Sequence, residues 1–212
     1  MTRFTGGLSR CFRLGALLLL CMSPAGNLPA AEDRQQWQQP DRVMADLHPQ
    51  PGATIADVGC GRGYFTFRLA RAVGRKGKVL AADVDSEALD SLRQQVAREK
   101  LDNVEVIQSA PKSTKLPPAS LDAALVCLVL HEASPDDRLP LVRDVARALK
   151  PGGFLFIIDH RKSREVTFDP YEKLIPRDEL VKLATDAGLT LDAEFHYLKY
   201  QVFLRFRKPL QP

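Results

Sequence analysis

The stretch that decides the fold reads Ile55-Ala56-Asp57-Val58-Gly59-Cys60-Gly61-Arg62-Gly63-Tyr64-Phe65-Thr66. It begins with an apolar run typical of a buried strand, continues with glycines at every second position, and ends where an apolar helical pattern starts. Glycine lets the backbone turn tightly and approach a ligand, and the free N–H groups of the next helix point toward that ligand. The stretch therefore predicts a strand, a ligand-binding loop and a helix.

Alternating strand and helix patterns extend on both sides of this loop. Strands are expected at 53–58, 78–83, 104–107, 121–130, 154–158, 190–197 and 201–207, and helices at 40–47, 65–73, 86–96 with Ser86 as N-cap, 139–149 and 177–187. Such alternation predicts an α/β fold with a doubly wound sheet, and the last two strands read as an antiparallel hairpin at one edge. Ligands of these sheets bind at the carboxyl ends of the strands.

Length and charge limit the classes of function. The chain has 212 residues, of which 45% are hydrophobic and 26% charged, which fits one domain with a sizeable core. The formal net charge is +4, but Arg3, Arg10 and Arg13 account for three of these charges, so about +1 remains for the rest. Because no basic stripe with interleaved aromatic residues is present, nucleic acid is not expected as a partner.

Residues 1–30 have the pattern of a signal peptide or targeting segment. Three arginines precede an apolar run from Leu14 to Met22, and small residues suitable for cleavage surround Ala30. The run is too short to span a membrane, so no spanning helix is expected. We expect export, to the periplasm; the alternatives are an uncleaved anchor, or a start at Met22 and a cytoplasmic protein.

The cysteines and histidines give no metal signature. Cys60 and Cys127 lie outside the leader, and both are expected to be small buried side chains. The sequence contains no C-x-x-C, no H-E-x-x-H and no other cluster with ligand spacing, so no metal site is expected.

A carboxylate pair around the loop indicates the kind of ligand. Asp83 ends the second strand, 22 residues after Gly61, where an acid can accept hydrogen bonds from both hydroxyls of a ribose. The glycine spacing is G-x-G-x-G, not the G-x-G-x-x-G of dinucleotide sites. Asp57 beside the loop would repel a pyrophosphate but suits a cationic amino group. A nucleoside that carries an amino acid is therefore favoured over NAD.

At these motifs the chain resembles the class I S-adenosylmethionine-dependent methyltransferases. The first motif of that family resembles Asp57-Val58-Gly59-Cys60-Gly61-Arg62-Gly63, its ribose-binding acid matches Asp83, its fourth-strand motif resembles Leu121 to Glu132, and its turn before strand five matches Lys150-Pro151-Gly152-Gly153. The resemblance covers residues 40–208. It implies a seven-stranded Rossmann-like sheet of order 3-2-1-4-5-7-6 with strand seven antiparallel. We divide the chain into the leader, an N-terminal arm and helix at 31–52, and a methyltransferase domain at 53–208.

The resemblance also implies S-adenosylmethionine as cofactor and a set of residues that bind it. These are Asp57, Gly59, Cys60, Gly61, Gly63, Asp83, Ser109 and Ala110. Many family members carry an acid after strand three that binds the adenine amino group, whereas this chain has Gln108-Ser109-Ala110-Pro111 there. The adenine contact is therefore expected from Ser109 or from the backbone of Ala110.

The resemblance leaves the methyl acceptor open. Methyl transfer is mainly a matter of positioning two reactants, and a base is needed only if the acceptor must lose a proton. His131 follows strand four and is the candidate base, with a purely structural histidine as the alternative. Glu132, Asp159 and His160 are the other candidates near the strand ends. Glu132 is expected to be a helix-start or loop carboxylate, and Asp159 and His160, which end strand five one position further from the cofactor, are expected in a solvated loop.

The function expected is therefore methyl transfer to a small-molecule or protein acceptor. No Asn/Asp-Pro-Pro-Tyr/Phe motif follows strand four and no Pro-Cys nucleophile is present, which disfavours the amino-methylating DNA and glutamine enzymes and the cytosine C5 enzymes. The alternative is a protein of the same fold that binds a nucleoside ligand without transferring a methyl group.

Overall fold

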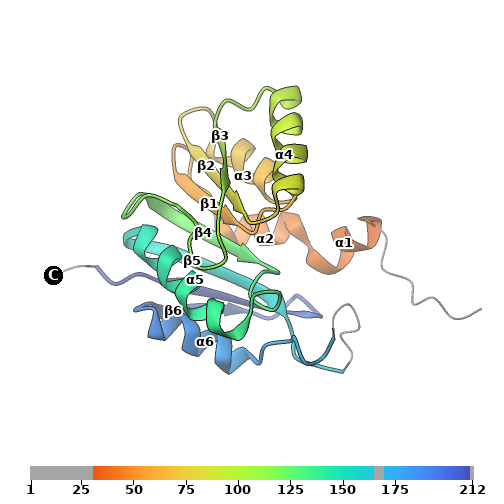
Figure 1. The fold of residues 1–212 in the computed structure, drawn as a ribbon, viewed down its shortest axis with the longest axis vertical. Helices are drawn as coiled ribbons and strands as arrows, with labels where there is room; N and C mark the ends of the chain where they lie inside the picture. Colours follow the sequence, from red (N-terminus) through yellow and green to blue (C-terminus); the bar gives the residue numbers. More distant parts are fainter. Residues whose placement is uncertain (1–30, 165–169, 211–212) are drawn as a thin grey trace, which may run out of the picture.

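The computed structural model describes residues 31–164 and 170–210, and within them the chain forms a seven-stranded sheet of order β3-β2-β1-β4-β5-β7-β6 (Figure 1). The strands are β1 Thr54–Val58, β2 Lys78–Asp83, β3 Val104–Gln108, β4 Leu121–Cys127, β5 Leu149–His160, β6 Thr190–Phe195 and β7 Gln201–Arg207. The helices are α1 Ala31–Gln38, α2 Pro40–Leu47, α3 Thr66–Val73, α4 Ser86–Glu99, α5 Pro135–Ala148 and α6 Arg177–Asp186. The strand order confirms the expected fold, and the predicted leader lies outside the described residues.

Five strands are parallel and two form the predicted hairpin. β1 lies between β2 and β4, with β3 and β5 continuing the parallel sheet outward. β7 pairs antiparallel with β5, and β6 pairs antiparallel with β7 at the edge. Buried parallel strands need cover on both faces, which α5 and α6 provide on one face and α2 and α3 on the other. No helix within the described ranges is both long and apolar enough to cross a bilayer.

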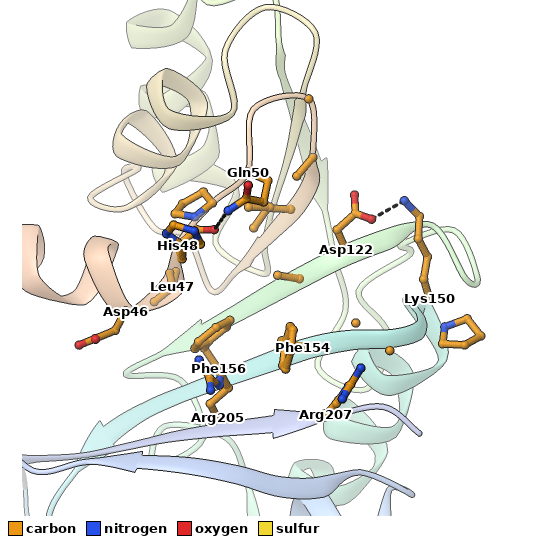
Figure 2. A pocket seen from close by; sticks show the side chains of 18 of the residues that line it. Asp46, Leu47, His48, Gln50, Asp122, Lys150, Phe154, Phe156, Arg205 and Arg207 are labelled. Carbon is orange, nitrogen blue, oxygen red and sulfur yellow. Dashed lines mark hydrogen bonds and ion pairs between the residues drawn. The ribbon is translucent and has the colours of Figure 1, made fainter. Parts of the chain in front are cut away.

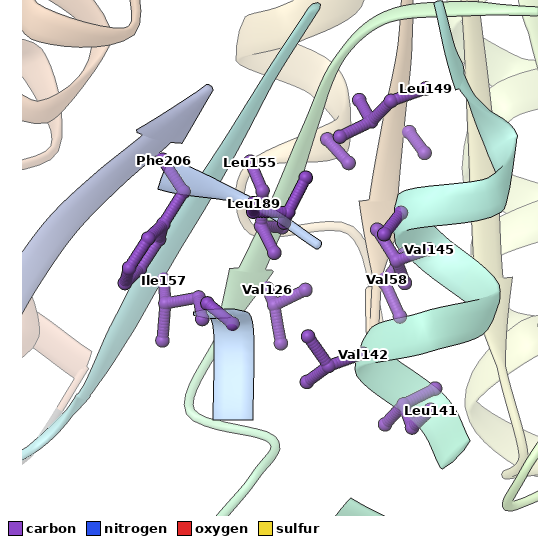
Figure 3. Packing of buried hydrophobic residues seen from close by; sticks show 14 of the residues in the cluster. Val58, Val126, Leu141, Val142, Val145, Leu149, Leu155, Ile157, Leu189 and Phe206 are labelled. Carbon is purple, nitrogen blue, oxygen red and sulfur yellow. The ribbon is translucent and has the colours of Figure 1, made fainter. Parts of the chain in front are cut away.

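Alternation along the central strands divides their side chains between two hydrophobic cores. Val58, Val126 and Ile157 belong to the cluster with α5 and α6 (Figure 3). Ile55 and Leu125, which have the opposite parity, belong to the cluster with α2 and α3. Because successive side chains of a strand point to opposite faces, Asp57 lies on the same face as Ile55, beneath the start of α3. The alternation thus positions one carboxylate of the expected site.

Several boundaries differ from those the sequence predicts. β4 ends at Cys127, not at Leu130, because Leu128 turns the chain with a φ of 60°. α5 begins at Pro135 instead of Leu139, since proline fits the first turn of a helix. The polar segment before Pro40 is helical and forms α1.

Two further details correct the prediction around α4 and β5. The N-cap of α4 is Asp85, whose Oδ1 accepts the N–H groups of Glu87 and Ala88 at 2.9 and 3.1 Å; Ser86 is the first helical residue. β5 is longer than the predicted 154–158 and runs to His160, because its pairing with β7 continues to Gln201.

Candidate functional site

The glycine loop lies at the carboxyl ends of β1 and β2, between β1 and α3. The N–H groups of Gly59 and Cys60 donate to the carbonyl oxygen of Ala82, at 2.7 and 3.2 Å. The N–H of Gly63 closes the turn by donating to the Cys60 carbonyl at 2.9 Å. Backbone bonds therefore hold the loop against the end of β2.

Asp83 links the end of β2 to the middle of this loop. Its Oδ2 accepts the N–H of Gly61 at 2.7 Å, and its Oδ1 accepts the N–H of Asp85 at 2.9 Å. Each carboxylate oxygen has a second lone pair, so these bonds leave acceptor capacity for a ligand. Asp83 thus has a structural role that the sequence did not reveal, alongside the position that the ribose role requires.

A cavity of about 380 Å³ opens beside the loop and brings several of the predicted residues together. Gly59, Asp83, Ser109 and Ala110 all line it. The turn after β4 forms the opposite wall, with Leu128, Val129 and Glu132. These three residues were not among the predicted cofactor-binding residues. The volume lies in the range of small-ligand sites.

Four of the predicted cofactor-binding residues do not line this cavity, namely Asp57, Cys60, Gly61 and Gly63. A Cβ built at Gly61 would meet no atom within 4 Å, so this part of the loop faces open space. Cys60 is buried, and burial raises the pKa of its thiol; Cys127 is buried too, and burial raises its pKa to about 12. Both cysteines are small buried side chains, as expected, and stay protonated.

Asp57 lies under the loop at 3% exposure and accepts the hydroxyl proton of Thr66 at 2.6 Å. Burial raises the pKa of this carboxyl from 3.8 to about 6; nearby Asp83 raises it further, while the Thr66 hydroxyl and the charge of Arg34 act in the opposite direction. Above about pH 6 the site therefore holds a buried carboxylate, which a cationic ligand group would neutralise.

This pKa gives a pH dependence that can be measured. Since the folded-state pKa lies above that of the unfolded chain, the folded state favours the protonated form, and Asp57 contributes most to stability below about pH 4. The contribution is lost as the pH rises through about 6, by at most about 3 kcal/mol. We expect the unfolding free energy of Asp57→Asn, relative to the unsubstituted protein, to rise over this window in urea titrations. A difference that does not change with pH would contradict the assignment.

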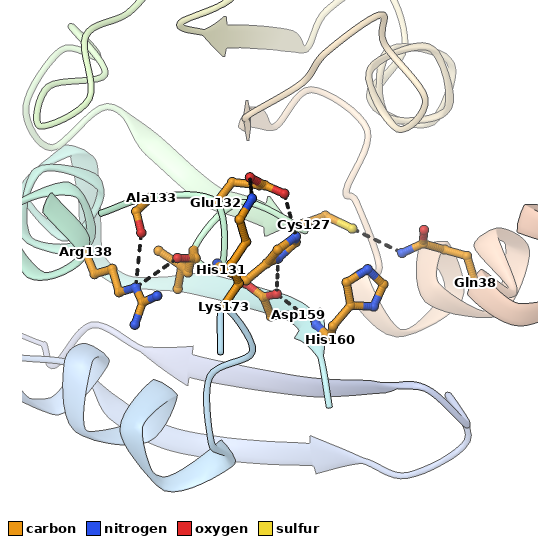
Figure 4. A network of polar contacts seen from close by, with 10 residues as sticks. Gln38, Cys127, His131, Glu132, Ala133, Arg138, Asp159, His160 and Lys173 are labelled. Carbon is orange, nitrogen blue, oxygen red and sulfur yellow. Dashed lines mark hydrogen bonds and ion pairs between the residues drawn. The ribbon is translucent and has the colours of Figure 1, made fainter. Parts of the chain in front are cut away.

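His131 lies in a polar network at the ends of β4 and β5 (Figure 4). Its Nδ1 is 2.5 Å from Oδ1 of Asp159, and its backbone N–H donates to Oδ2 of the same carboxylate at 3.2 Å. Its Nε2 lies 3.4 Å from Oε1 of Glu132, whose Oε2 accepts from Lys173 at 2.8 Å. The Lys173 ammonium holds the pKa of Glu132 below its ordinary value.

The placement of Asp159 and His160 corrects the expectation of a solvated loop. Asp159 is 0% exposed and His160 is 4% exposed, because β5 continues to His160 within the sheet. The parallel register of β4 and β5 pairs Cys127 with Ile158, which brings Asp159 next to the turn that carries His131. Its position directly after the predicted strand 154–158 made Asp159 a candidate, but no local pattern predicted its burial or its contact with His131.

Arg138 at the start of α5 holds the turn that carries His131. Its Nε donates to the carbonyl oxygens of Leu130 and Ala133, at 3.0 and 3.3 Å, and its Nη1 pairs with Glu179 at 3.1 Å. This buried arginine was not among the residues that the sequence pointed to. The Arg138 side chain of the next helix therefore holds the backbone of this turn in place.

A larger cavity, of about 830 Å³, lies at the opposite edge of the sheet (Figure 2). Ala53 at the start of β1 and the ion pair between Asp122 and Lys150 border it, with Phe154 and Phe156 along β5. No residue of the glycine loop lines this cavity. Because ligands of open α/β sheets bind at the carboxyl ends of the strands, the smaller cavity is the candidate site. Within 31–164 and 170–210, no group of acids, histidines and cysteines is arranged to hold a metal ion.

Comparisons with known proteins agree with this geometry. A family model described as a methyltransferase domain matches residues 55–153. The ubiquinone/menaquinone biosynthesis C-methyltransferase UbiE of Vibrio vulnificus (strain YJ016) is 30% identical over 131 residues, which are 59% of this chain and 46% of that protein. The demethylmenaquinone methyltransferase of Staphylococcus epidermidis (strain ATCC 35984) is 27% identical over 133 residues, 63% of this chain and 53% of that protein. The chain thus spans about half the length of the curated relatives it matches.

A solved structure extends the likeness to most of the described residues. The crystal structure of an S-adenosylmethionine-dependent methyltransferase from Aquifex aeolicus matches with a TM-score of 0.76 and 29% identity, covering 83% of this chain and 93% of that one. The strand order, the glycine loop with Asp83, and these matches together support a class I S-adenosylmethionine-dependent methyltransferase.

Proposed function

We propose that this protein transfers a methyl group from S-adenosylmethionine to a small hydroxylated aromatic molecule that loses a proton during the reaction. One observation carries the proposal. The cavity beside the glycine loop is bordered by Glu132, and the adjacent His131 is held by a buried carboxylate. A site for the donor and a residue able to accept a proton therefore lie side by side.

The residues around the loop fit the donor. Asp83, Ser109 and Ala110 line a cavity large enough for a nucleoside, and the open space at Gly61 allows a ligand to approach the loop backbone. Asp57 supplies a negative charge for an amino group. When bound, S-adenosylmethionine supplies a methyl group on a positively charged sulfur, which is a good leaving group.

His131 is the residue that would accept a proton from the methyl acceptor. In the neutral tautomer that donates Nδ1–H to Asp159, the imidazole carries a lone pair on Nε2, and this atom can take a proton from an acceptor hydroxyl. The imidazolium formed would lie beside the Glu132 carboxylate, which favours it electrostatically. Loss of the hydroxyl proton makes the ring oxygen, or the ring carbon beside it, a better nucleophile.

Two observations support an aromatic acceptor. The ring of His160 lies 5.1 Å from that of His131, and the ring of Trp37 lies 6.1 Å from that of His160, so aromatic side chains continue outward from one side of the base. Two relatives carry names that refer to ubiquinone and menaquinone biosynthesis and to demethylmenaquinone, although this chain spans about half of their length. A planar hydroquinone fits both the aromatic rings next to His131 and the names of these relatives.

The test is methyl transfer from isotope-labelled S-adenosylmethionine to a panel of hydroquinones, with primary amines as a contrasting class. We expect hydroquinones, and not amines, to gain one methyl group by mass spectrometry. Transfer to amines alone would contradict the assigned acceptor.

The second candidate, ligand binding without transfer, is favoured by the predicted leader, because S-adenosylmethionine is made in the cytoplasm. Calorimetry with S-adenosylmethionine, S-adenosylhomocysteine and NAD separates the classes. Binding of the first two with no transfer to any acceptor would support this candidate, and binding of NAD alone would refute both.

Asp83→Ala tests the donor site directly. We expect the affinity for S-adenosylhomocysteine to fall by about 1.5–3 kcal/mol, because charge-assisted bonds to the ribose are lost. The matched control is Asp85→Ala, which removes the α4 cap at a cost of about 1 kcal/mol in folding stability but does not alter the cavity lining. Equal affinity of both variants in calorimetry would refute the ribose role.

A further inference from the structure

The helix α1 carries a cation to the glycine loop. The guanidinium carbon of Arg34 lies 3.9 Å from the ring centroid of Tyr64, the residue that follows Gly63. Within α1, the Nε of Arg34 donates to Oε1 of Gln38 at 3.0 Å. The Nε of Arg34 is thus held by Gln38, and its guanidinium group lies over the ring of Tyr64.

The other end of α1 is fixed beside the strand ends. Gln38 is fully buried, and its Nε2 donates to Sγ of Cys127, the last residue of β4, at 3.1 Å (Figure 4). Trp37 lies against His160, which ends β5. The helix therefore extends from the glycine loop to the side of the site where His131 lies.

The terminal nitrogens of Arg34 remain available to a ligand. Among residues 31–164 and 170–210, neither Nη1 nor Nη2 has a hydrogen-bond or ion-pair partner. Arg68, the other arginine that stacks on Tyr64, instead uses its Nη1 to bind the Tyr64 carbonyl at 2.6 Å. A planar guanidinium with free donors matches a carboxylate in charge and geometry.

The charges at the loop complement an amino acid. Arg34 stacks on Tyr64 at the end of the loop that lies over buried Asp57, and its charge lowers the pKa of that carboxyl, so the two opposite charges lie in the same region. The loop is thus flanked by a carboxylate suited to an ammonium group and a guanidinium suited to a carboxylate. The amino-acid portion of the donor carries both groups.

We propose that Arg34 binds the carboxylate of the donor's amino-acid portion and so fastens α1 across the active site. The inference rests on the proposed function, since it concerns the same donor. Because Trp37 lies three residues later on the same helix, donor binding also fixes the Trp37 ring, whose centroid lies 6.1 Å from that of His160. Donor binding therefore orders the acceptor side of the site.

The experiment compares two nucleosides by calorimetry. S-adenosylhomocysteine carries the amino-acid portion, and 5′-methylthioadenosine lacks it. We expect Arg34→Ala to weaken binding of S-adenosylhomocysteine by roughly 10–100-fold and to leave 5′-methylthioadenosine unchanged, with Arg34→Lys between. The control is Arg42→Ala, which removes an equivalent arginine–tyrosine stack, 3.8 Å above Tyr197 and away from the loop.

A second measurement reports on α1 itself. Trp37 is the single tryptophan of the chain, so its fluorescence is specific to this helix. S-adenosylhomocysteine should protect Trp37 from quenching by acrylamide in the unsubstituted protein but not in Arg34→Ala, and 5′-methylthioadenosine should protect in neither.

The outcomes separate the two levels of the proposal. If Arg34→Ala binds S-adenosylhomocysteine as tightly as the unsubstituted protein, or weakens both nucleosides equally, the role of Arg34 is overturned while donor binding stands. If the unsubstituted protein binds neither nucleoside, the proposed function itself fails.

Discussion

Replacing His131 by asparagine should lower kcat for methyl transfer by roughly 10²–10⁴-fold, the usual range for removal of a general base. The asparagine amide can still donate a hydrogen bond to Asp159, so the buried carboxylate keeps a partner. What the variant lacks is a basic atom in the position of Nε2. The expected loss is therefore chemical and not structural.

The affinity for S-adenosylhomocysteine distinguishes loss of the basic atom from damage to the structure. His131 does not line the donor cavity, so the His131→Asn variant should bind this nucleoside as the unsubstituted protein does. Asp159→Asn should also lower kcat, because the amide can present an N–H to Nδ1 and so favour the wrong tautomer of His131. His196→Asn, an exposed histidine beyond β6, is the control and should keep full activity. A His131→Asn protein with unchanged kcat would show that the histidine is structural.

The second large effect is expected at Gly59. An alanine Cβ here would lie 2.1 Å from Cγ2 of Val129, and the φ of +70° is strained for any residue other than glycine. Overpacking costs about 1–3 kcal/mol and the left-handed backbone about 1–2 kcal/mol, so Gly59→Ala should lose about 2–5 kcal/mol of folding stability. Because Gly59 and Val129 both line the candidate donor cavity, binding of S-adenosylhomocysteine should weaken as well.

Gly61→Ala is the matched control for this substitution. Gly61 also has a positive φ, of 52°, but a Cβ there meets nothing within 4 Å, so only the backbone cost of about 1–2 kcal/mol applies. Adding Val129→Ala to Gly59→Ala removes the clashing methyl group and should restore part of the stability in urea unfolding. Equal destabilisation by the two glycine substitutions, with no recovery in the double variant, would refute the steric explanation.

The sequence by itself predicted the strands, the helices and the glycine loop, and its resemblance to a family implied the order of the strands in the sheet. Apolar runs, helical periodicity and the glycine loop are local patterns, and the short connections between them permit few arrangements of strands and helices. The position of Asp83 followed for the same reason, since the spacing of strand, loop and strand places its carboxylate beside Gly61, while its role toward a ribose stays a prediction. Small errors, such as the extension of β4 to Leu130, arose where an apolar run continued into a turn.

Only the tertiary structure decided what surrounds His131. His131 and Asp159 are 28 residues apart, Glu132 and Lys173 are 41 apart, and no local pattern relates either pair. Their contacts depend on the register of β4 with β5 and on the path of the chain after β5. Arg34 reaches Tyr64 only because α1 packs across the strand ends, although its own sequence is polar. Local sequence fixes each element, whereas these side chains meet because the elements pack, and packing is a property of the whole chain.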